Sequence, residues 1–130
     1  ENWRHAEAPI GERVETALGM MIARGTTHVR TYAQVDVDAG LARLEAVLAA
    51  RERFADAADV EVVAFPQAGI VREKGVADLL DAALREGADL VGGLDPVQYD
   101  RDPVRHLDIV FGLAEKHGKG VDIHLTASLG

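Results

Sequence analysis

Residues 60–69 read Val-Glu-Val-Val-Ala-Phe-Pro-Gln-Ala-Gly, an apolar, β-branched run that a proline brings to an end. β-Branched and aromatic side chains favour strands, and proline cannot continue a central strand because it has no N–H to donate. The stretch therefore predicts a buried strand over residues 60–65 and a turn after it. Gln67 stands in that turn, just beyond the carboxyl end of the strand.

An amphipathic stretch followed by a short apolar run recurs along the chain, with the strands beginning roughly 30 residues apart. Helices are predicted over residues 10–24, 38–54, 76–86 and 102–117, and strands over residues 27–32, 60–65, 89–94 and 121–125. Gly25 suits a helix C-terminus, Asp38 an N-cap, and Asp102 an N-cap followed by Pro103. Parallel strands need such helical connections, so the sequence predicts one α/β unit with a parallel sheet over residues 1–130.

Two architectures fit this pattern. One is an open, doubly wound sheet, and the other is part of a (β/α)₈ barrel, whose usual size is about 250 residues. The chain opens with a predicted helix and stops directly after a predicted strand. This favours consecutive units of a longer repeat, resembling half of a barrel.

The composition excludes several classes of protein. The 130 residues carry 14 Lys and Arg against 22 Asp and Glu, a net charge of −8, and no cysteine. An acidic chain is a poor non-specific binder of nucleic acid or anionic membranes, and without cysteine it has neither disulfides nor thiolate ligands. No uncharged apolar stretch approaches the roughly 18 residues of a membrane span, and the N-terminus is not a signal peptide. A cytoplasmic location is the expectation.

Ligands of parallel α/β proteins collect at the carboxyl ends of the strands, which draws attention to His124 and Gln67. His124 could bind a metal through a neutral imidazole, and the Gln67 amide could pair with a substrate that has an amide or ureide edge. Each also has a structural interpretation, His124 as a hydrogen-bonded strand end and Gln67 as part of the turn. Asp95, before Pro96, is better explained by a turn than by a ligand.

The common nucleotide-binding and serine-hydrolase motifs are missing, and the glycine pair and the remaining histidines have structural explanations. The sequence has no GxGxxG, GxxxxGK[ST] or GxSxG motif, so dinucleotide, P-loop and serine-hydrolase chemistry lose their usual signatures. Gly92 and Gly93 lie inside a predicted strand and form no phosphate cradle. His28, His106 and His117 are expected to be surface or packing residues.

Four segments, in this order, resemble the cytosine deaminase-like branch of the metal-dependent amidohydrolases. They are HVRT at residues 28–31, VAFPQAGI at 63–70, GADLVGG at 87–93 and VDIHL at 121–125. The resemblance covers nearly the whole chain and implies a (β/α)₈ barrel in which these strands are the second to fifth. It also implies hydrolysis of a C–N bond in a pyrimidine- or triazine-like heterocycle, with a divalent metal (zinc or iron) activating water.

Residue by residue, the resemblance makes His124 the fifth-strand metal ligand and Gln67 the glutamine that hydrogen-bonds the substrate ring. The chain departs from the family pattern elsewhere: Tyr32 replaces a histidine, Ala68 a glutamate and Ala127 the proton-shuttling glutamate. The first-strand HxH pair, the sixth-strand histidine and the eighth-strand aspartate are not in the sequence. The chain alone is therefore expected to be catalytically incompetent unless other residues or another chain complete the barrel.

Two alternatives remain open at this point. The chain could be a non-catalytic scaffold or binding module derived from the barrel fold, or an open-sheet domain in which Gln67 and His124 are structural. The expected partner is a small heterocyclic molecule, with no nucleic acid and no membrane. Unpaired strand edges of a partial barrel favour association, which predicts a homo-oligomer.

Overall fold

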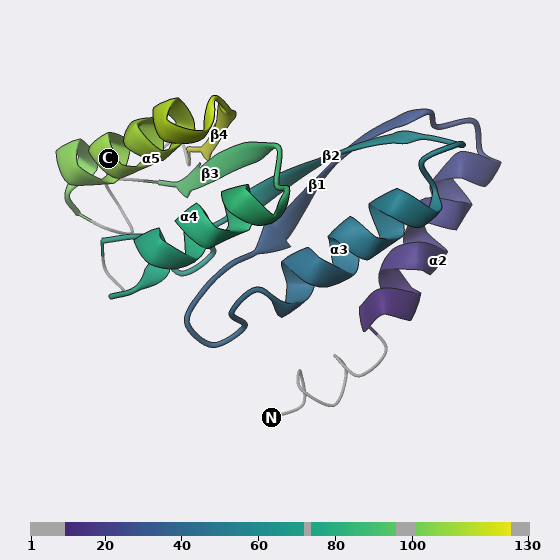
Figure 1. The fold of residues 1–130 in the computed structure, drawn as a ribbon, viewed down its shortest axis with the longest axis horizontal. Helices are drawn as coiled ribbons and strands as arrows, with labels where there is room; N and C mark the ends of the chain where they lie inside the picture. Colours follow the sequence, from purple (N-terminus) through teal and green to yellow (C-terminus); the bar gives the residue numbers. More distant parts are fainter. Residues whose placement is uncertain (1–9, 72–73, 96–100, 126–130) are drawn as a thin grey trace.

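The computed structural model describes residues 10–71, 74–95 and 101–125 and contains four parallel strands that alternate with helices (Figure 1). The elements are α2 (Ile10–Ala23), β1 (His28–Gln34), α3 (Ala42–Arg53), β2 (Asp59–Phe65), α4 (Val76–Glu86), β3 (Leu90–Leu94), α5 (Pro103–His117) and β4 (Gly120–His124). The predicted α/β class and the parallel sheet are confirmed. No helix in the described part of the chain is long and apolar enough to cross a membrane.

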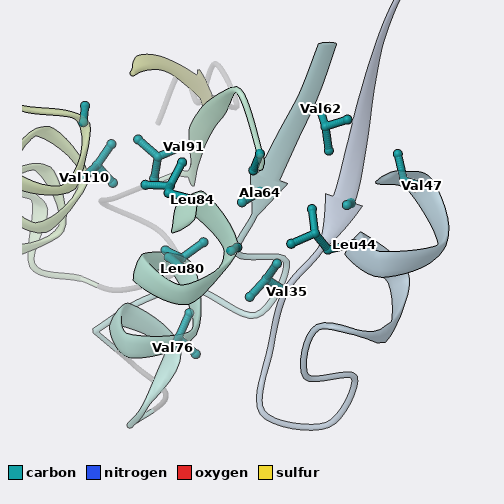
Figure 2. Packing of buried hydrophobic residues seen from close by; sticks show 14 of the residues in the cluster. Val35, Leu44, Val47, Val62, Ala64, Val76, Leu80, Leu84, Val91 and Val110 are labelled. Atoms are coloured by element: carbon teal, nitrogen blue, oxygen red, sulfur yellow. The ribbon is translucent and has the colours of Figure 1, made fainter. Parts of the chain in front are cut away.

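The order of the strands separates the two predicted architectures. The sheet runs β1-β2-β3-β4 without reversal. Crossovers of one hand place successive helices on the same side of such a sheet, whereas the reversal in a doubly wound sheet places them on both sides. The strand residues Val62, Ala64 and Val91 share one buried cluster with helix residues (Figure 2). The helix members of that cluster include Leu44 of α3, Leu80 of α4 and Val110 of α5. The arrangement is that of consecutive units of a barrel.

Strand β2 lies between two neighbours and is buried on both of its faces. Val62 and Ala64 face the helices, whereas Val63 and Phe65 belong to a second cluster with Leu90 on the opposite face. This explains why the sequence of β2 is continuously apolar and does not alternate with polar residues. The edge strand β1, in contrast, has exposed side chains at His28, Arg30 and Tyr32 and a buried one at Ala33.

Gly92 and Gly93 give β3 room for a large side chain on each of its faces. A Cβ on Gly92 would lie 2.8 Å from the Phe65 ring, and one on Gly93 would lie 2.9 Å from His106 Nε2. Consecutive strand residues point to opposite faces of the sheet. The Phe65 ring therefore packs against β3 on one face, and the fully buried His106 packs against it on the other. The expected packing role of His106 is thus confirmed, and the glycine pair serves packing.

The ends of the helices confirm two of the three predicted signals. Gly25 has a φ of +94°, the left-handed region that glycine tolerates. Asp102 caps α5 by accepting a hydrogen bond from Arg105 N at 3.2 Å, and Pro103 follows as the first helical residue.

The prediction that Asp38 caps the second helix is wrong, because α3 begins at Ala42 with Leu41 in the N-cap position. The preceding turn is organised by Asp36, which is buried and whose Oδ1 accepts a hydrogen bond from Ala39 N at 2.7 Å. Such a side-chain-to-backbone bond offers the chain an alternative to helix and delays the helix start.

Asp81 joins α4 to α5. Its Oδ1 lies 2.7 Å from His117 Nε2 and 3.1 Å from Lys116 Nζ, and its Oδ2 lies 3.6 Å from Arg85 on its own helix. The hydrogen bond from His117, followed by that from Lys116, lowers the pKa of Asp81 below its usual 3.8. The predicted surface or packing role of His117 is borne out at this junction.

We expect replacement of Gly92 by alanine to destabilise the fold by about 1–3 kcal/mol, because the added methyl group displaces the Phe65 ring. Gly112→Ala in α5 is the matched control, since nothing lies within 4 Å of a Cβ at that position. There the same change should stabilise the helix by about 0.5–1 kcal/mol. Urea unfolding followed by circular dichroism measures both free energies, and effects of the same sign would contradict the packing account.

The ionised Asp81 carboxylate should stabilise the fold near neutral pH. Its pKa is lower in the folded state than in the unfolded chain, so the folded protein binds fewer protons. This contribution is complete above the unfolded pKa, near 3.8, and is lost as the pH falls from there through the folded value. Chemical unfolding of the native protein and Asp81→Asn between pH 7 and pH 2.5 should show the stability gap closing in that window. A gap independent of pH would refute it, and Asp78→Asn, an exposed position on α4, is the control.

Candidate functional site

The two residues singled out from the sequence both lie at the carboxyl edge of the sheet. His124 is the last residue of β4 and pairs in register with Leu94 of β3. Gln67 is exposed and follows Pro66 at the end of β2, in a turn closed by a hydrogen bond from Gly69 N to Pro66 O at 2.9 Å. Both residues therefore lie at the carboxyl edge, as expected from their positions at the ends of predicted strands.

Three aromatic rings gather at this edge. The His124 ring centroid lies 4.8 Å from that of Phe65 and 4.9 Å from that of Tyr32, and the Tyr32 and Phe65 rings meet edge to face at 5.7 Å. Such spacings are those of favourable aromatic pairs. Phe65 also lies two residues before Gln67 in the chain. The residue whose ring contacts His124 is therefore close in sequence to Gln67.

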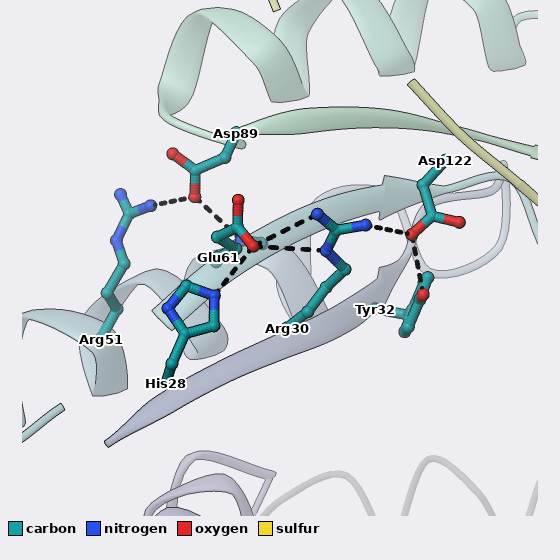
Figure 3. Close-up of polar contacts among 8 residues, drawn as sticks. His28, Arg30, Tyr32, Arg51, Glu61, Asp89 and Asp122 are labelled. Carbon is teal, nitrogen blue, oxygen red and sulfur yellow. Dashed lines mark hydrogen bonds and ion pairs between the residues drawn. The ribbon is translucent and has the colours of Figure 1, made fainter. Parts of the chain in front are cut away.

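The Asp122 carboxylate holds two side chains of the opposite edge strand (Figure 3). Its Oδ2 accepts a hydrogen bond from Tyr32 Oη at 2.8 Å and from Arg30 Nη1 at 3.0 Å. Asp122 is in β4 and the other two are in β1, and three strand spacings would separate these strands by about 14 Å in a flat sheet. The contacts show that the sheet is concave on the side away from the helices.

The polar chain continues across the concave face toward the amino ends of the strands. Glu61 Oε1 lies 3.3 Å from Arg30 Nη2 and 3.0 Å from His28 Nε2. The hydrogen bonds from His28 and then from Arg30 lower the pKa of Glu61, and the hydrogen bond to Asp122 raises the pKa of the Tyr32 phenol. Near neutral pH, Glu61 is therefore ionised, and Tyr32 is protonated and acts as a hydrogen-bond donor. His28 is exposed, as expected for a surface residue.

Neither this network nor the three-ring cluster was predicted from the sequence. A signal was available, because residues 28, 30 and 32 alternate along one strand and must share a face. What the sequence does not contain is the curvature that brings those residues to Asp122 on another strand.

Asp95 has a structural role at the same edge. It is buried, has a φ of +29°, and donates its backbone N–H to His124 O at 2.7 Å. This bond extends the pairing of β3 and β4 beyond the last residue of β3. The turn predicted at Asp95 and Pro96 lies partly outside the described residues.

His124 fits one ligand of a divalent metal site. Its side chain is exposed at the carboxyl edge, and imidazole nitrogen is a common ligand of zinc and iron. Within residues 10–71, 74–95 and 101–125, no group of three or more His, Asp or Glu side chains is placed to hold a metal ion. Further ligands would have to come from other segments.

Two cavities lie at opposite edges of the sheet. One of about 570 Å³ is at the amino edge and includes Arg51 and Asp89, whose Nη1 and Oδ2 atoms form an ion pair at 2.8 Å. A smaller one, of about 280 Å³, is lined at the carboxyl edge by Tyr32, Phe65 and Gln67, among others. The smaller cavity includes Gln67 but not His124, and most of its other lining residues come from α2, α3 and β1.

Comparisons with known proteins identify relatives over nearly the whole chain. No protein-family model matches the sequence. It is 37% identical over 125 residues to N-isopropylammelide isopropyl amidohydrolase of Pseudomonas sp. (strain ADP), covering 96% of this chain and 30% of that protein.

Two solved structures agree with that result. One is N-isopropylammelide isopropylaminohydrolase from Burkholderia multivorans, with a TM-score of 0.81 and 47% identity over 82% of this chain and 27% of that one. The other is 5-methylcytosine deaminase from Klebsiella pneumoniae liganded with phosphonocytosine, with a TM-score of 0.77 and 38% identity over 88% of this chain and 28% of that one. The resemblance found in the sequence is confirmed: the chain is homologous to a segment of the cytosine deaminase-like amidohydrolases, spanning about 30% or less of the length of these relatives.

Proposed function

We propose that this chain forms the second-to-fifth-strand portion of an amidohydrolase barrel that hydrolyses a C–N bond of a pyrimidine- or triazine-like heterocycle. The observation that carries the proposal is the homology to enzymes named for such substrates, together with His124 and Gln67 at the carboxyl edge of the sheet. That edge is where barrel enzymes of every characterised chemistry place their active sites.

In this proposal Gln67 binds the substrate and His124 is one ligand of a divalent metal. The Gln67 amide offers two N–H donors and a carbonyl acceptor, which match the alternating donors and acceptors of a ring amide edge. When bound, the metal would supply an activated water at neutral pH. The cavity beside Tyr32, Phe65 and Gln67 offers the substrate ring an aromatic wall.

A second candidate function is a non-catalytic scaffold or binding module that retains the fold. It is favoured by the methyl side chain of Ala68, where the family pattern places a glutamate, and by the lack of a three-ligand group among the described residues. Ala127, where the proton-shuttling glutamate is expected, lies outside the described residues. One missing acid–base group can lower a rate about 10² to 10⁴-fold.

Metal content tests the role of His124. In protein that also contains the segments supplying the further ligands, plasma mass spectrometry should find about one zinc or iron per chain, and His124→Ala should lower the metal affinity at least tenfold. His28→Ala is the matched control, because His28 is exposed at the start of β1 and bonds to Glu61. Equal metal content in the native protein and His124→Ala would exclude His124 as a ligand, and no metal in either would favour the scaffold.

Substitution of Gln67 tests the substrate class. With cytosine, 5-methylcytosine and N-isopropylammelide as probes, Gln67→Leu should weaken binding about tenfold, the worth of one or two hydrogen bonds. Gln67→Glu keeps the size of the side chain and an oxygen acceptor but removes both N–H donors. It therefore shows whether hydrogen bonds donated by Gln67 bind the substrate ring. Isothermal titration calorimetry measures each affinity. Unchanged affinities in both variants would leave Gln67 with a turn role only.

Self-association stays a prediction. Strands β1 and β4 are the outer strands of the described sheet, and an unpaired strand edge is a template for pairing with another strand. Further strands of a barrel or a second copy of the chain would satisfy these edges equally well. Light scattering on the purified protein distinguishes an oligomer from a monomer.

A further inference from the structure

We propose that Tyr32 and Asp122 are positioning residues for the His124 imidazole. This inference rests on the proposed role of His124 as a metal ligand. It assigns a task to Tyr32, one of the positions at which the chain departs from the family pattern.

The first argument is that two aromatic rings contact the His124 ring, which is otherwise exposed. Phe65 and Tyr32 lie on it at centroid distances of 4.8 and 4.9 Å, with ring planes tilted by 55° and 59°. Phe65 is only 5% exposed, and its ring packs closely on β3 because Gly92 has no side chain there. The contact of Phe65 with His124 is therefore rigid. Tyr32 is 42% exposed, and ring contacts alone would leave it free to swing away.

The second argument is the hydrogen bond that prevents this swing. Tyr32 Oη donates to Asp122 Oδ2 at 2.8 Å, which fixes the far end of the phenol ring. The acceptor is fixed in turn, because Arg30 Nη1 donates to the same oxygen at 3.0 Å and the Asp122 side chain is only 14% exposed. Charge-assisted bonds of this kind are short and well oriented.

The third argument is the position of Asp122 in the chain. It lies two residues before His124 in β4, so both side chains project from the same face of the strand. The network that starts at Arg30 thereby controls the orientation of the ring at the end of the same strand. A metal ligand held in one orientation loses less entropy when the metal binds, and loss of such support typically lowers metal affinity 10- to 100-fold.

The experiment measures the motion of the His124 ring and the affinity for zinc as separate quantities. Purified protein carrying ¹³C at the histidine Cε1 positions is studied without metal by NMR relaxation, and zinc affinity is measured by competition with a chelator. Tyr32→Phe removes only the hydroxyl group, and Asp122→Ala removes the acceptor. Asp108→Ala, an exposed position on α5, is the matched control. The His117 ring, held by Asp81 on the helix side, is the internal reference.

We expect both variants to increase the amplitude of His124 ring motion and to lower zinc affinity at least tenfold, whereas Asp108→Ala and the His117 signal stay unchanged. Unchanged His124 motion in Tyr32→Phe would overturn the inference, whatever the zinc affinity. Increased His124 motion with unchanged zinc affinity would support the positioning by Tyr32 and overturn the ligand role of His124. Circular dichroism checks the fold of Asp122→Ala, and Tyr32→Phe alone decides the matter if that variant unfolds.

Discussion

The Asp122 carboxylate joins two strands that are separated in the sheet by two others, and the geometry of the concave face depends on it. All the described helices pack on one side of the sheet, and the polar groups of the other side pair with one another although several of them are exposed to solvent. Asp122 satisfies Arg30 and Tyr32 together, and Arg30 passes the connection to Glu61. The Asp122 side chain is only 14% exposed, so the loss of its partners would be destabilising, and these contacts and the curvature of the sheet stabilise each other.

The amino and carboxyl edges of the sheet differ in the side chains that they carry. At the amino edge, Arg51 bonds to the Asp89 carboxylate and to Gly87 O, and Asp89 accepts a further hydrogen bond from Val62 N. These contacts tie α3, β2 and the start of β3 together without exposing a reactive group. At the carboxyl edge, the side chains of Gln67 and His124 are exposed. The ion pair of Arg51 and Asp89 thus lies at the edge opposite to Gln67 and His124.

Much of the fold could be predicted from the sequence, because each strand and helix is encoded by local periodicity and by terminators such as Pro66 and Gly25. The start of α3 could not, since the hydrogen bond from Ala39 N to Asp36 competes with a cap at Asp38 over a few residues. The choice between the two sheets depended on strand order, which periodicity does not contain. The positions of Gln67 and His124 at strand ends could be predicted because strand ends are encoded locally, whereas the link between Tyr32 and Asp122 spans 90 residues and needs the curvature of the sheet.

The glycine pair in β3 has a consequence for how this sequence can change over time. Phe65 and His106 occupy the space that side chains at positions 92 and 93 would fill, one on each face of the same strand. A smaller residue at 65 or 106 would relieve only part of this crowding, because a Cβ at 92 would also lie 3.0 Å from Ala64 O and one at 93 would lie 3.1 Å from Ile123 Cγ1. Glycine at positions 92 and 93 is therefore hard to replace even when residues 65 and 106 change, and the contact of Phe65 with the His124 ring depends on Gly92.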